Sequence, residues 1–92
     1  MKRIPAKPSA LTRAMHQMEG RIVGLEALLN VVFREWGREP EVVMAYLEQT
    51  AERCAATSLQ QPGWSDAHIE GMEHAFQEGI AALRGRIEFP DQ

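Results

Sequence analysis

The chain has 92 residues, of which 45% are hydrophobic and 25% charged, and its net charge is −3. This composition is typical of one small globular domain with a modest core, and it is too apolar for a fully disordered chain. The single cysteine excludes an intramolecular disulfide, and no apolar run approaches the roughly 20 residues that span a bilayer. We therefore expect a cytoplasmic protein that does not associate with membranes.

Residues 1–8 are predicted to form a basic, flexible arm. Lys2, Arg3 and Lys7 bring three positive charges with no acid among them, and Pro5 and Pro8 disfavour helix. An arm of this kind suits contact with phosphate or with an acidic partner, so an accessory role on nucleic acid is one alternative function. The net negative charge of the chain argues against a general attraction to nucleic acid.

Residues 9–90 are predicted to form one helical domain, with helices over about 9–37, 40–60 and 65–88. Ser9 is a good N-cap for the first helix, and Gly37 is a good stop. Between them, apolar residues recur at alternating spacings of four and three, which is the heptad pattern of a coiled coil. This heptad seam consists of Leu11, Met15, Met18, Ile22, Leu25, Leu29, Val32 and Trp36.

The second helix is expected to start at Pro40 and the third after Ser65. Proline is well suited to the first position of a helix, and Ser65 followed by Asp66 suits the positive end of the helix dipole. No stretch of the sequence alternates like a strand. The predicted fold class is therefore all-α, a three-helix bundle with a long first helix. One face of the third helix is marked by Ile69, Met72, Phe76, Ile80, Leu83 and Ile87.

The first helix is predicted to associate with another copy of itself. Over residues 25–33 only Glu26 and Asn30 are polar, and two shorter helices cannot cover a helix that is apolar nearly all round. We expect a homodimer or a higher oligomer; the alternative is a monomeric bundle with the first helix at its centre. The residues predicted at the self-association interface are Met15, Met18, Ile22, Leu25, Leu28, Leu29, Val32, Phe33 and Trp36.

The charges beside the heptad seam favour a parallel pair. In that orientation Arg21 would face Glu26 of the second copy. In an antiparallel pair Glu19 would instead approach Glu26. Exposed ion pairs contribute only about 0–1 kcal/mol, so this preference is small.

Four glycines lie inside the predicted helices: Gly20 and Gly24 in the first, Gly71 and Gly79 in the third. Each costs about 1 kcal/mol relative to alanine in a helix interior. Close approach of a second helix or of a ligand would offset that cost, and the alternative is a tolerated loss of helix propensity.

The sequence contains no recognisable catalytic, metal-binding or nucleotide-binding motif, so we predict no enzymatic activity, no cofactor and no metal. His68 and His74 are six residues apart, which places them on opposite sides of a helix. Glu70, His74 and Glu78 share one face, a pattern more typical of a solvated surface than of a metal site.

The predicted function is a non-enzymatic protein-interaction module, an adaptor or inhibitor of another protein like many small bacterial or phage accessory proteins. An alternative is a regulatory protein that binds a small molecule or nucleotide between subunits. Trp64 is either an exposed contact residue or a lid over the end of the bundle. The partner-binding candidates are Trp64, Tyr46, Lys2, Arg3 and Lys7, and the anion-binding candidates of the alternative are Arg13, Arg21, Arg84 and Arg86.

Overall fold

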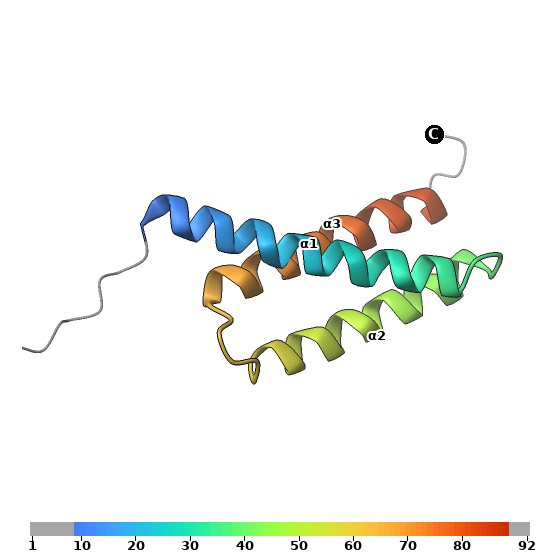
Figure 1. The fold of residues 1–92 in the computed structure, drawn as a ribbon. Helices are drawn as coiled ribbons and strands as arrows, with labels where there is room; N and C mark the ends of the chain where they lie inside the picture. The colour runs from blue at the N-terminus through green and yellow to red at the C-terminus, as the bar shows by residue number, and fades with distance from the viewer. Residues whose placement is uncertain (1–8, 89–92) are drawn as a thin grey trace, which may run out of the picture.

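The computed structural model describes residues 9–88, which form three helices joined by two short connections (Figure 1). They are α1 (Ala10–Arg34), α2 (Pro40–Ser58) and α3 (Asp66–Glu88). Residues 9–88 contain no strand, and the all-α prediction is confirmed. The predicted basic arm, with Lys2, Arg3 and Lys7, lies outside the described residues.

The helices begin where their capping residues predict. The Ser9 side chain accepts a hydrogen bond from the backbone N–H of Thr12, at 3.1 Å, and Pro40 is the first residue of α2. The first helix ends at Arg34 and not at the predicted residue 37, because the N–H of Trp36 bonds to the carbonyl of Phe33, three residues back, and the chain then turns. Gly37 lies in that turn with a φ of +88°, a conformation that favours glycine.

Helices α1 and α3 run parallel and approach closely through glycine. A Cβ atom added at Gly20 would overlap the carbonyl oxygen of His68, and one added at Gly71 would overlap that of Gln17. One helical turn further along α1, a Cβ at Gly24 would lie 2.9 Å from the carbonyl oxygen of Met72. Because only hydrogen fits at these points, the backbones of the two helices meet directly. The close-approach interpretation of the helical glycines is confirmed here.

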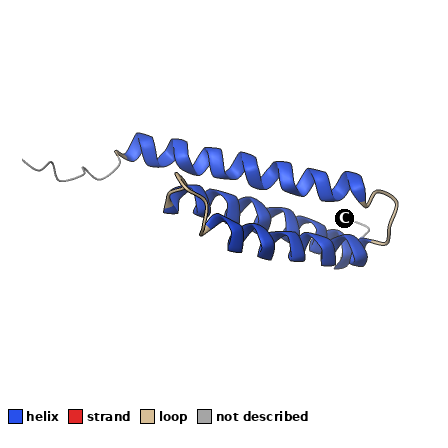
Figure 2. Cartoon of the chain, turned by 60° about the horizontal axis from the view of Figure 1, so that its bottom comes forward, coloured by secondary structure: helices blue, strands red, loops and turns tan. Residues whose placement is uncertain are grey.

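The buried core lies where the three helices meet. Val31 and Met72 are the largest fully buried side chains, and Leu28, Leu47 and Phe76 complete the central cluster. Figure 2 shows α1 as one layer and α2 with α3 as the other, so both shorter helices cover the same side of α1. The opposite side of α1 has no helix of the described chain over it. None of the three helices is long and apolar enough to cross a membrane.

Candidate interaction surface on the first helix

The uncovered side of α1 carries a continuous row of large apolar side chains, which we call the outer stripe. Each of them is between 41% and 76% exposed, with the highest value at Trp36. Seven of the eight residues of the predicted heptad seam belong to this row, and Val32 lies half-buried at its edge. The outer stripe consists of Leu11, Met15, Met18, Ile22, Leu25, Leu29 and Phe33 on α1 and of Trp36, which the structure places in the turn after α1 and not, as predicted, in the helix.

The sequence pattern groups Leu28 with these residues, and the structure corrects that assignment. Its side chain is only 8% exposed, and its Cδ1 atom fills the space left by Gly79 on α3. The residue lies on the side of α1 that packs on α3, together with Gly20 and Gly24, because these positions are four apart in a helix. Leu28 is therefore a core residue and not part of the outer stripe.

Two ion pairs link α1 to α3 beside the glycine contact. Arg13 donates to both carboxylate oxygens of Glu70, at 2.9 and 3.0 Å. Arg21 likewise donates to both oxygens of Glu78, at 3.1 and 2.6 Å. These exposed pairs contribute little individually, but they bind the polar edge of α1 to α3.

The same contacts shift the pKa values of the groups involved. A hydrogen bond from Gln17, aided by the charge of Arg13, lowers the pKa of the Glu70 carboxyl. The hydrogen bond between Arg21 and Glu78 lowers the pKa of Glu78 and raises that of Arg21. Both carboxylates are thus paired with arginines of α1, and the nearby His74 also lowers the pKa of each.

An apolar groove adjoins the outer stripe at the C-terminal end of α1. It has a volume of about 510 Å³ and is formed where α1, the start of α2 and α3 meet. Val32 lines it from α1 and Trp36 from the turn that follows, so the groove and the stripe share one edge. Other apolar lining residues are Leu28, Pro40, Val43, Leu47 and Leu83.

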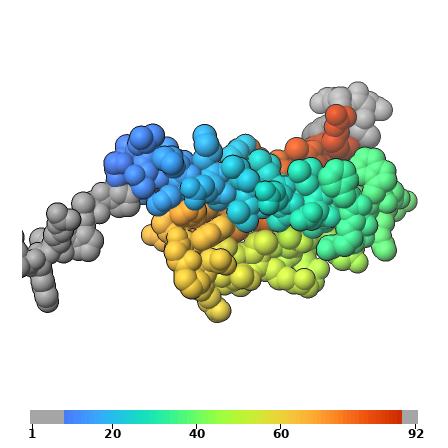
Figure 3. Space-filling view, viewed as in Figure 1, coloured from blue at the N-terminus to red at the C-terminus, as the bar shows by residue number. Residues whose placement is uncertain are grey.

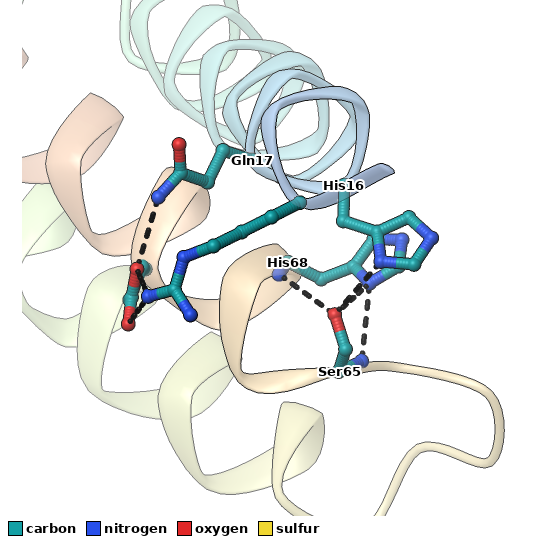
Figure 4. Close-up of polar contacts among 6 residues, drawn as sticks. His16, Gln17, Ser65 and His68 are labelled. Carbon is teal, nitrogen blue, oxygen red and sulfur yellow. Dashed lines mark hydrogen bonds and ion pairs between the residues drawn. The ribbon is translucent and has the colours of Figure 1, made fainter. Parts of the chain in front are cut away.

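Histidine and serine side chains cluster at the start of α3 (Figure 4). His68 is 6% exposed, and its ring lies between those of His16 and Trp64, with centroid separations of 4.2 and 5.4 Å. The His68 Nδ1 accepts from the backbone N–H of Ser65 at 3.0 Å, and Nε2 lies 2.8 Å from a carboxylate oxygen of Glu19. This pattern places the proton of neutral His68 on Nε2.

The row of contacts from Ser65 through His68 to Glu19 has the composition of a hydrolytic triad, with Ser65 Oγ 2.8 Å from His68 Nδ1, but it also forms the cap of α3. The Ser65 hydroxyl accepts from the backbone N–H of His68, at 3.4 Å, as an N-cap residue does. The lone pair of Nδ1 that would take the serine proton is shared with the Ser65 N–H, which donates to it at 3.0 Å. We interpret the cluster as a structural tie between α1 and α3.

The aromatic partner-binding candidates pack against their own chain. Trp64 is half-buried, lies over the core and stacks on His68, which is the lid arrangement. Tyr46 also packs against the core, with the Arg34 guanidinium 5.9 Å above its ring. Among the aromatic residues of the described chain, Phe33 and Trp36 are the ones that solvent reaches most.

The anion-binding candidates do not converge on one site. Arg13 and Arg21 pair with α3 carboxylates, and Arg84 pairs with Glu48 of α2 at 3.1 Å. Arg86 lies in the last turn of α3. No group of three or more His, Cys, Asp or Glu within residues 9–88 is arranged to hold a metal ion.

The histidine cluster does not stand out in the sequence, because His16 and Ser65 are 49 residues apart. A local signal is present, since Ser65 and His68 have the spacing of an N-cap and the third helical position.

Comparisons with protein-family models, curated proteins and solved structures find no match for this chain. Its function is therefore argued from its own residues.

Proposed function

We propose that the chain is a non-enzymatic interaction module that assembles with a second copy through the outer stripe of α1 and acts as an adaptor or inhibitor of another protein. The observation that carries the proposal is a heptad seam whose side chains point away from their own bundle. A heptad seam packs against another helix, and the helices of this chain occupy the opposite side of α1.

The size of the outer stripe supports a stable contact. Eight large apolar side chains, exposed to between 41% and 76%, present on the order of 900 Å² if each has a surface of about 200 Å². The largest apolar patch of an ordinary monomer is about 300–600 Å². A typical specific interface covers about 800 Å² on each partner. The exposed apolar area of the stripe thus matches one side of a typical interface, and it is larger than the largest apolar patch of an ordinary monomer.

The distribution of polar residues supports the same assignment. Within the stripe, successive apolar residues follow one another at spacings of three or four, so no charged side chain interrupts the row. Glu19 and Glu26 lie to one side of it, and Arg21 lies to the other and pairs with Glu78. An apolar centre with polar borders is the usual anatomy of a protein interface.

Assembly is tested with Leu29→Glu, measured by gel filtration with light scattering and by far-ultraviolet circular dichroism. Leu29 is 53% exposed, so the folded monomer accepts a glutamate there. We expect the wild-type chain to elute above its monomer mass of 10.4 kDa and the variant to elute as a helical monomer. The cause is the burial of an unpaired charge in the interface, which costs several kcal/mol.

Ala82→Glu is the matched control, because it adds the same charge to an exposed position on α3. We expect this control variant to keep the wild-type mass. A wild-type chain that is monomeric at high micromolar concentration contradicts the proposal, and so does a Leu29→Glu variant that assembles like the wild type.

A further inference from the structure

We infer that the two copies pair antiparallel, so that the first turns of each α1 cover the apolar groove at the C-terminal end of the other α1. This inference rests on the proposed self-association and specifies its geometry. The evidence for it is that the two ends of the outer stripe have different surroundings.

The N-terminal end of α1 extends past the other helices. On α1, the backbone at Gln17 and Gly20 lies against the backbone of the first turns of α3, at Gly71 and His68 respectively. The backbone of residues 10–15 therefore projects beyond the start of α3, as Figures 1 and 3 show for the blue end of the helix, and only the long Arg13 side chain reaches back to Glu70. Leu11 is 71% exposed and Met15 is 54% exposed. The hollow beside this half of α1, of about 570 Å³, is lined mainly by polar side chains such as those of Gln17, Glu70 and Glu73, so it offers no apolar cover to Leu11 and Met15.

The C-terminal end of α1 has the opposite character. Here α1, the start of α2 and the middle of α3 line the groove of about 510 Å³, and Val32 and Trp36 lie at its rim. The Trp36 ring is 76% exposed and lies against Phe33, with 6.5 Å between ring centroids. A parallel pair would place two such tryptophans face to face and leave both projecting ends together. An antiparallel pair brings each projecting end to a groove.

The spacing of the heptad seam permits the antiparallel register without any mismatch. The seam begins at Leu11 and ends at Trp36, and its spacings read the same from either end. Reversing one copy about the midpoint of the seam pairs every seam residue with another seam residue of the second copy. The helical layers are Met15 with Val32, Met18 with Leu29, and Ile22 with Leu25, and beyond them Leu11 faces Trp36 in the turn after α1.

The structure removes the charge argument for a parallel pair. Arg21 is held by both oxygens of Glu78 in its own chain, so Glu26 of a parallel copy would meet an arginine that is already neutralised. The carboxylate of Glu19, which would approach Glu26 in an antiparallel pair, is turned to the His68 ring at 2.8 Å. The opposed helix dipoles add a further preference for antiparallel pairing.

Disulfide trapping distinguishes the two orientations. We would prepare Met15→Cys and Val32→Cys separately in a Cys54→Ala background, give one of them a mass tag, and mix them in a glutathione redox buffer. In the antiparallel register these positions face each other. In the parallel register they lie 17 residues apart along the helix, or about 25 Å, whereas a disulfide needs Cα atoms within about 7 Å. Intact mass spectrometry measures the three possible dimers.

The expected result is at least a tenfold excess of the mixed Met15→Cys–Val32→Cys disulfide over either self-disulfide. An Ala82→Cys control, exposed on α3, reports the yield of random collisions. A predominance of self-disulfides would establish a parallel pair and overturn the inference. A yield of the mixed disulfide no higher than that of the Ala82→Cys control would overturn the proposed antiparallel register. A monomeric wild-type chain in light scattering is the separate result that rejects self-association itself.

Discussion

The close contact between α1 and α3 predicts that Gly20→Ala destabilises the fold, although alanine is the better helix former. The added Cβ would overlap the carbonyl oxygen of His68 and come within 3.0 Å of its Cα. These atoms belong to the backbone of α3, so relief requires the two helices to separate. Separation by even 0.5–1 Å forfeits about a quarter to a half of the dispersion energy of each contact between them.

The magnitude follows from two opposing effects. Overpacking of a rigid site lowers the free energy of unfolding by about 3 kcal/mol or more. The higher helix propensity of alanine raises it by about 1 kcal/mol. We expect a net loss of about 2 kcal/mol or more in the free energy of unfolding. For a domain of this size, such a loss is a large part of the total stability.

Gly85→Ala is the matched control, since a Cβ there meets nothing within 4 Å and the position is also helical. It is expected to stabilise the chain by about 0.5 kcal/mol. Both variants are measured by urea unfolding, followed by circular dichroism at one protein concentration, because assembly also contributes to stability. If Gly20→Ala proves as stable as Gly85→Ala, the helices do not meet through glycine and the packing argument is refuted.

Three further predictions concern the polar contacts and the thiol. The lowered pKa of Glu78 adds stability that is complete above the ordinary glutamate value of about 4.3 and is lost as the pH falls through the lowered value. The melting temperature of the wild type should therefore drop more steeply on acidification than that of Arg21→Gln, and parallel curves would contradict this. Ser65→Ala removes the cap of α3 and should cost about 1 kcal/mol in urea unfolding, whereas a loss below about 0.3 kcal/mol would show that His68 caps alone. Burial raises the pKa of the Cys54 thiol, so iodoacetamide should alkylate it several-fold more slowly in the native chain than in urea at the same pH, and equal rates would refute this.

The sequence by itself determined the local structure of this protein. Ser9 caps α1, Pro40 opens α2 and Gly37 turns the chain between them, because each of these preferences involves only a few neighbouring backbone groups. The heptad seam is equally a property of the sequence, since residues that share a helix face are set by the 3.6-residue period alone. Most residues of the outer stripe therefore follow from their spacing along the chain.

Only the tertiary structure decided which side of α1 would be buried. The period of a helix groups residues into faces, but it does not say which face meets a neighbouring helix. Gly20 and Gly24 admit the backbone of α3 on one side, and this approach buries Leu28 while turning Leu29 outward. The contact of His68 with Glu19 depends on the same approach, because it joins residues 49 apart in the chain. The physical reason is that such contacts form only after the helices have packed, so no local sequence preference encodes them.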